Sequence, residues 1–156
     1  MTVPDIALAD CREQDWDTLA AFMHAFCEED GHAHGPDNEA ALRTLIDNPL
    51  YGRALLVWHG DEPVGYAVLC YGFSLEFCGR DGFLDDIYVA PAHRGLGIGR
   101  LVLERLQAVA RDDGIRTLHL EVMDGNDGAA RLYRRLGWHT RKSRMMTKSL
   151  VADAAT

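Results

Sequence analysis

Three glycines separated by single residues, Gly95, Gly97 and Gly99, follow an apolar strand-like run and directly precede a helical pattern. Glycine adopts backbone conformations that other residues avoid, so several N–H groups of such a turn can point into one concavity. The start of the following helix adds partial positive charge. The local fold is therefore constrained to strand, tight turn and helix, and the turn suits the oxygens of a phosphate.

Two well-known phosphate-binding motifs do not match this turn. A dinucleotide fingerprint needs a third glycine three residues after Gly97, and Arg100 stands there. A P-loop needs Gly-Lys followed by Ser or Thr, and the turn contains no such pair. Two interpretations remain: a diphosphate cradle of another kind, or a turn that merely joins strand to helix.

Apolar periodicity predicts the elements on either side of the turn. The first part of the chain is expected to form a short edge strand, a helix capped by Asp15 or Asp17, a loop and a second helix, with the strand over 6–9, the loop over 28–36 and the second helix over 37–46. Three apolar runs then predict an antiparallel meander, at 54–58, 64–71 and 83–89.

Beyond the turn, helical spacing predicts a helix that Gly114 stops and a later helix that Gly137 ends. Alternation predicts a strand over 117–122, and a last strand is expected over 145–150. A chain of 156 residues has the length of one ordinary domain, so we expect a single domain over 1–156.

Composition excludes several classes of protein. With 47% hydrophobic and 26% charged residues the chain is expected to bury a core, and it shows neither a membrane-spanning run nor a secretory leader. Its four cysteines form no CxxC pair, so we expect reduced thiols and a cytoplasmic protein. The net charge of −8 argues against binding to nucleic acid or to an anionic membrane.

The charges are divided unevenly along the chain. Residues 1–90 hold 17 acidic side chains against four Arg, a net of −13, whereas residues 91–156 hold 12 basic side chains against seven acidic ones, a net of +5. The first part is expected to attract cations and the second part anions.

Two motifs resemble those of the GCN5-related N-acetyltransferase (GNAT) family. Arg94, Gly97 and Gly99 match its acetyl-CoA motif, Arg or Gln, two residues, Gly, one residue, then Gly or Ala. Downstream stands its second motif, with Trp in place of Phe at the end: Asn126, Ala129, Leu132, Tyr133, Gly137 and Trp138. The strand over 83–89 looks most like that of small-amine and polyamine acetyltransferases.

The resemblance implies a fold and a cosubstrate. The fold is an α/β three-layer α-β-α sandwich with a mixed sheet and a V-shaped splay between central strands, in which acetyl-CoA is wedged. Pantetheine would pair with the backbone of Ile87 and Val89, next to Tyr88, and Asn126 would contact the cofactor near its thiol. The diphosphate would bind the turn and its flanks, namely Arg94, Gly95, Leu96, Gly97, Ile98, Gly99 and Arg100.

Acetyl transfer needs a neutral amine, a polarised thioester and a proton for the departing thiolate. Tyr133 is the expected acid, since a phenol and a thiolate have similar basicity. By resemblance, Asp85 is the expected base, acting through water. Asp86, Glu76 and a chain of waters stay open as alternatives, and a carboxylate there could instead pair with an Arg.

The acidic segment that includes Glu28 and Glu29 is expected to overhang the acceptor site, where it and Asp85 would bind a cation, or else to be a solvated face. From the sequence we expect no metal, because the spacing of the residues in this segment that could ligate one, from His24 to His34, matches no zinc signature.

The sequence thus predicts an acetyl-CoA-dependent N-acetyltransferase that acts on a primary amine, a small cationic one, by direct attack in a ternary complex. Two alternatives are a non-catalytic acyl-CoA-binding sensor or interaction module, and an enzyme that acetylates protein N-termini or lysines. The acceptor and the length of the acyl group are open. Relatives often form dimers, so the resemblance also allows a homodimer.

Overall fold

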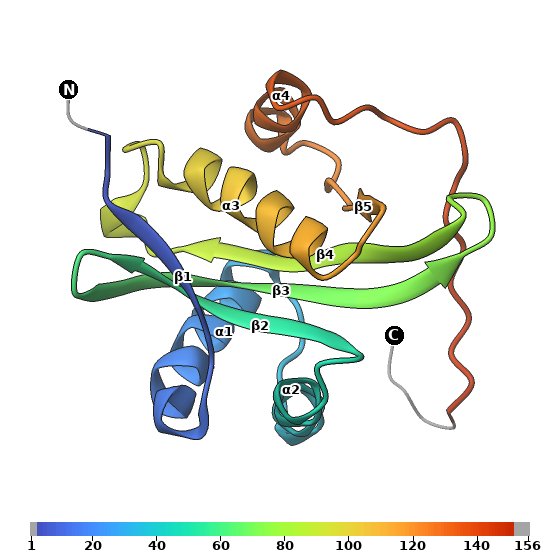
Figure 1. Ribbon diagram of the computed structural model, residues 1–156. Helices are drawn as coiled ribbons and strands as arrows, with labels where there is room; N and C mark the ends of the chain where they lie inside the picture. Colours follow the sequence, from blue (N-terminus) through green and yellow to red (C-terminus); the bar gives the residue numbers. More distant parts are fainter. Residues whose placement is uncertain (1–2, 152–156) are drawn as a thin grey trace. The chain divides into compact units, whose positions relative to one another are not determined.

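The computed structural model describes residues 3–151 (Figure 1). The chain divides into two compact units, Met1–Glu121 and Val122–Thr156, and each is considered by itself. The single domain expected over 1–156 stays a prediction.

A five-stranded mixed sheet forms the centre of the first unit. The strands lie in the order β1-β2-β3-β4-β5, and all neighbours are antiparallel except β4 and β5, which are parallel. The strands are β1 (Ile6–Asp10), β2 (Gly52–His59), β3 (Glu62–Ser74), β4 (Gly79–Val89) and β5 (Thr117–His119). The helices are α1 (Trp16–Asp30), α2 (Pro36–Asp47) and α3 (Ile98–Asp112), with two 3₁₀ turns, η1 (Glu13–Asp15) and η2 (Pro91–His93).

Helices cover both faces of this sheet, with α1 and α2 on one face and α3 on the other (Figure 1). The middle of β2 is buried on both faces, which explains the unbroken apolar run over 54–57. One core cluster joins α1 and α2 to the sheet and includes Leu19, Leu42, Leu56, Tyr66 and Tyr88. The expected three-layer α-β-α fold and the expected meander are therefore confirmed.

A β-bulge shifts the alternation of β4. Val68 of β3 pairs with Asp86, whereas Leu69 pairs with Leu84, so Asp85 is an extra residue without a partner in β3. Val68 belongs to the core cluster under α1 and α2, and Leu69 follows it on the opposite face. The bulge therefore places Leu84 and Asp86 on opposite faces, although an unbroken strand would put them on the same face.

The place for the expected V-shaped splay of the sheet is between β4 and β5. These strands pair at only three positions, and the last pair is Phe83 with His119. Beyond it, β5 ends and β4 continues to Val89, so residues 84–89 of β4 have no partner in β5.

Two sequence predictions about segment ends are wrong. The loop expected over 28–36 is shorter, because α1 continues to Asp30 and stops at Gly31, whose φ of 69° is left-handed, and α2 begins at Pro36. The strand expected over 117–122 ends at His119.

The second unit contains α4 (Asp127–Arg135), which ends before Gly137 as predicted. The last strand expected over 145–150 is wrong, because these residues form no strand and Met145, Met146 and Leu150 are exposed. Apolar side chains favour a strand only where a partner strand completes the hydrogen-bonded ladder.

The four cysteines are free, as expected. No helix within residues 3–151 is both long and apolar enough to cross a membrane.

Candidate active site

The glycine-rich turn has the open backbone that its sequence predicts. Gly95 and Gly97 have φ values of 78° and 80°, in the left-handed region that disfavours other residues, and Gly97 is the N-cap of α3. A Cβ atom added at Gly95, Gly97 or Gly99 would meet no atom within 4 Å, so this surface is open. A ligand can approach the backbone closely here.

The N–H groups of the turn are suited to an anion. The backbone bonds that flank it run from Arg94 N–H to the Pro91 carbonyl and from Leu101 N–H to the Gly97 carbonyl. The first-turn N–H groups between them have no carbonyl within the helix to donate to, and the first turn of α3 carries no acidic residue. The partial positive charge of the helix start is therefore not neutralised within α3.

The side chain of Arg94 ties the turn to β4 and α1. Its Nε donates to the Val89 carbonyl at 2.7 Å, and its Nη2 donates to both carboxylate oxygens of Glu29 at 2.9 and 2.8 Å. Its guanidinium also lies 5.4 Å from the centre of the Tyr88 ring. Glu29, expected at the acceptor site, is thus paired with a residue of the cofactor motif, while Glu28 is exposed at the end of α1.

The edge of β4 that faces away from β3 offers free backbone groups. Ala90 N–H donates to the Val64 carbonyl of β3 at 2.8 Å. Because N–H groups along a strand alternate between its two edges, those of Ile87 and Val89 point away from β3, toward the edge where β5 is absent. These are the two residues expected to pair with pantetheine, although the carbonyl of Val89 already accepts from Arg94.

Asp86 is a half-buried carboxylate of β4. It accepts a hydrogen bond from the Tyr66 hydroxyl at 2.8 Å, and the ring of Tyr66 is fully buried. Burial raises the pKa of Asp86, and the negative charges of Asp85 and Asp30 raise it further; the hydrogen bond from Tyr66 and the charge of His32 act in the opposite direction. A carboxylate with a raised pKa is a candidate for general base.

Asp85, the base expected by resemblance, is exposed on the bulge next to Asp86. Successive side chains of a regular strand point to opposite faces of the sheet, but at a bulge this alternation does not separate Asp85 from Asp86. Glu76, the third alternative, lies in the turn between β3 and β4.

The surroundings of Asp86 are rich in aromatic side chains and thiols. Phe26 of α1 packs against Tyr66 and Tyr88, with ring centres 6.3 and 6.2 Å apart. Burial, followed by the charges of the two β4 aspartates, raises the pKa of Cys70 to about 11, so this thiol stays protonated.

Tyr66 is the residue that sequence reasoning missed, because it and Asp86 lie 20 positions apart and only the register of β3 and β4 brings them together.

Asn126 and Tyr133 lie in the second unit. Asn126 is the N-cap of α4, and its Oδ1 accepts a hydrogen bond from Ala129 N–H at 3.2 Å. The ring centre of Tyr133 lies 6.1 Å from that of Trp138, and burial raises the pKa of its phenol. Among the described residues, one group of possible metal ligands, His24, His34 and Glu39, gathers between α1 and α2.

The chain belongs to the acetyltransferase (GNAT) family, whose model matches residues 13–138. It is 44% identical over 80 residues to thialysine N-epsilon-acetyltransferase from Bos taurus, a match covering 49% of this chain and 47% of that protein. To the Caenorhabditis elegans protein of the same name it is 30% identical over 116 residues, or 74% of this chain and 71% of that protein.

Among solved structures, an integron cassette protein from the mobile metagenome of Cole Harbour Salt Marsh superposes with a TM-score of 0.81. It is 32% identical, and the match covers 93% of this chain and 91% of that one. The chain spans about half the length of several curated relatives that it matches, including the Bos taurus protein at 47%.

Proposed function

We propose that this protein transfers the acetyl group of acetyl-CoA to a primary amine of a small cationic molecule. One observation carries the proposal: β4 has an open edge that suits pantetheine, leads to an open glycine turn that suits a diphosphate, and carries the half-buried Asp86, whose pKa is raised. Acetyl-CoA is the cosubstrate of the family, and the relatives named above are acetyltransferases of an amino group on a small molecule.

The cofactor is proposed to bind in two parts. Its diphosphate accepts hydrogen bonds from the backbone N–H groups between Gly95 and Arg100, and its pantetheine pairs with the open edge at Ile87 and Val89. An N–H beside Tyr88 is proposed to polarise the thioester carbonyl. Asn126 is proposed to reach the thiol end through its amide Nδ2, since its Oδ1 caps α4.

The chemistry proceeds by direct attack. A base removes a proton from the ammonium group of the acceptor, and the neutral nitrogen bonds to the thioester carbon. The carbon–sulfur bond breaks with its electron pair on sulfur, and the acylated nitrogen releases its second proton to solvent, which leaves a neutral amide. Asp86 is better supported as the base than Asp85, because it is less exposed and its pKa is raised. Asp85, acting through water, is the alternative that mutation must separate from it.

Tyr133 is proposed to protonate the departing thiolate. Burial raises the pKa of its phenol, so that the group is fully protonated at neutral pH and available as a donor. The family motif supports this role, since Asn126, Ala129, Leu132 and Tyr133 stand at its spacing.

Purified protein mixed with acetyl-CoA and a panel of thialysine, lysine, polyamines and aminoglycosides should release CoA with at least one amine. Tyr133→Phe should lower kcat by about 10²-fold or more, with little change in the KM for acetyl-CoA. Tight CoA binding by calorimetry without turnover of any amine would overturn the proposal in favour of a non-catalytic acyl-CoA sensor. Turnover confined to peptides would favour a protein acetyltransferase.

A further inference from the structure

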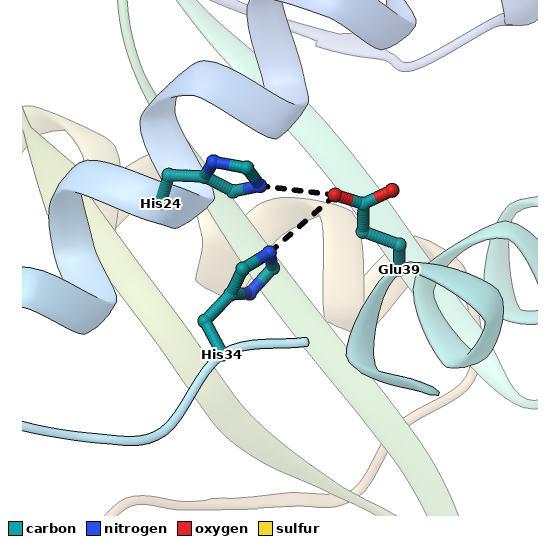
Figure 2. Close-up of side chains that lie close together, drawn as sticks. All are labelled: His24, His34 and Glu39. Carbon is teal, nitrogen blue, oxygen red and sulfur yellow. Dashed lines mark hydrogen bonds and ion pairs between the residues drawn. The ribbon is translucent and has the colours of Figure 1, made fainter. Parts of the chain in front are cut away.

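Three side chains from separate segments converge on one point between α1 and α2 (Figure 2). His24 belongs to α1, Glu39 to α2, and His34 to the loop between them. The Nε2 atoms of His24 and His34 lie 3.0 and 3.5 Å from the same carboxylate oxygen, Oε1 of Glu39. The two imidazole rings are 4.0 Å apart between centres, and the three ligand atoms lie within 4.8 Å of one another.

These distances match the edges of a metal coordination tetrahedron. Imidazole and carboxylate ligands about 2.0 to 2.1 Å from Zn²⁺ lie about 3.3 Å from one another at tetrahedral angles. The two nitrogen–oxygen separations, 3.0 and 3.5 Å, bracket that value. We propose that His24, His34 and Glu39 bind a divalent transition metal ion of the zinc type.

The burial of the three side chains suits a site with an open position. The side chain of His34 is only 16% exposed, whereas those of His24 and Glu39 are 48% and 37% exposed. The cluster therefore has a protein side and a solvent side. Three protein ligands with a water molecule on the solvent side complete a four-coordinate zinc shell.

The ring of His34 has few other restraints on its position. Its buried Nδ1 has no hydrogen-bond partner among the described residues, so its polar contact is the 3.5 Å approach of Nε2 to Glu39. A bond from Nε2 to a metal ion would hold the ring in the orientation in which it already lies.

The position of the site gives it a structural consequence. A metal ion here would tie the C-terminal half of α1, the loop over 31–35 and the first turn of α2 to one another. In the same loop, Nδ1 of His32 lies 3.6 Å from the carboxylate of Asp30, and both residues act electrostatically on Asp86. The ion would thus restrain the loop that carries charges near the proposed base. The site itself does not depend on the proposed acetyltransferase activity.

Sequence reasoning predicted no metal because it considered spacing up to His34. Glu39, the third ligand, lies five residues farther on and one turn into α2. Only the packing of α1 beside α2 brings it to the two histidines.

The test uses protein without an affinity tag, stripped with a chelator and titrated with Zn²⁺ in a calorimeter. One Zn²⁺ should bind per chain, and the melting temperature should rise with Zn²⁺ concentration. His34→Ala and Glu39→Gln should each weaken binding by more than about 100-fold, the upper range for loss of a residue that only supports a ligand. His32→Ala, in the same loop, should bind Zn²⁺ as the unmodified protein does.

Glu39→Gln replaces a partly exposed side chain with one of the same shape, so it should fold like the unmodified protein, which far-ultraviolet circular dichroism checks. X-ray absorption at the zinc edge should show scattering from two imidazole rings. The proposal is overturned if no saturable binding is found, if His34→Ala and Glu39→Gln leave the affinity unchanged, or if His32→Ala loses as much affinity as they do.

Discussion

Strand β3 carries two tyrosines that each donate a hydrogen bond to an aspartate, and the two pairs differ in charge environment. Tyr66 donates to Asp86 at 2.8 Å, and Tyr71 donates to Asp113 at 2.5 Å. Asp113 follows α3 and Asp86 lies in β4. The pKa of Asp86 is raised, while that of Asp113 is lowered.

The guanidinium of Arg53 accounts for the difference between the pKa shifts of Asp113 and Asp86. Arg53 donates to both oxygens of Asp113 at 2.6 and 2.7 Å and also binds Asp10, and Arg80 donates to the backbone carbonyl of Asp113 at 2.8 Å. Arg53 is the main cause of the lowered pKa of Asp113. Asp86 is half-buried near other acids, and Tyr66 is the hydrogen-bond donor described for it.

Asp113 is a structural carboxylate, whereas Asp86 has the surroundings that suit the base proposed above. The Asp113 cluster neutralises its charge and joins β1, β2, β3 and β4 to the end of α3. Asp86 is half-buried with less neutralisation of its charge, an arrangement that costs stability and suits a group that exchanges protons.

The largest expected effect is on catalysis. Asp86→Asn should lower kcat/KM for the amine by about 10²- to 10⁴-fold, because it removes the proposed base. The melting temperature of Asp86→Asn should not fall at neutral pH, because the amide that replaces the carboxylate carries no charge that must be desolvated. Steady-state kinetics and thermal unfolding measure the two effects.

Asp85→Asn is the matched control for this prediction and should retain most of the activity. If Asp85→Asn is inactive while Asp86→Asn is active, the base is Asp85 and not Asp86.

At the pair formed by Tyr71 and Asp113, the expected effect is on the free energy of unfolding. Asp113→Asn should lower the free energy of unfolding by about 2 kcal/mol, because it leaves Arg53 without its bidentate partner. Activity should stay close to that of the unmodified protein. Urea unfolding at neutral pH measures the loss.

The difference in unfolding free energy between the unmodified protein and Asp113→Asn should depend on pH. Since the folded-state pKa of Asp113 is depressed, its contribution is present above the unfolded-state pKa and is lost as pH falls through the folded-state value. The unmodified protein and Asp113→Asn should therefore converge in strong acid. A difference that persists unchanged there would mean that the charge of Asp113 is not its source.

Removal of each tyrosine hydroxyl should affect the two aspartates differently. The hydrogen bond from Tyr66 lowers the pKa of Asp86, so Tyr66→Phe should move the acidic limb of the pH–rate profile to higher pH. Tyr71→Phe should leave the profile in place and cost about 1 kcal/mol of stability. Equal profiles for the two variants would remove Asp86 from the titration that governs the rate.

The smallest expected effect is that of salt. If the acidic region around Asp86 attracts a cationic amine, raising the ionic strength should increase KM for the amine severalfold by screening. KM for acetyl-CoA should rise as well, since CoA is anionic and the turn is not neutralised within α3. Initial rates in 0.05 and 0.5 M salt decide this, and a flat response would leave the charge division along the chain without a role in binding.

Local pattern predicted much of this protein. The meander over 54–89, the helix that Gly114 stops and the helix that ends before Gly137 all form as expected, because each depends on periodicity and turn residues within a short segment. The open geometry at Gly95 and Gly97 was also predictable, since left-handed backbone conformations strongly favour glycine.

Segment ends and irregularities were not predictable in the same way. The strand expected over 145–150 did not form, because a strand needs a partner that no local pattern identifies. The bulge at Asp85 comes from the register of β4 against β3, and it overrode the simple alternation of side chains.

The order of residues along the chain was enough to identify the family, the glycine-rich turn and the residue types available for acetyl transfer, because each of these is a local pattern. Which polar side chains lie close together depended on the tertiary structure. It paired Glu29 with Arg94, left Asp86 with Tyr66, and brought Glu39 to His24 and His34. Electrostatic energies depend on distance and burial in space, and sequence separation measures neither.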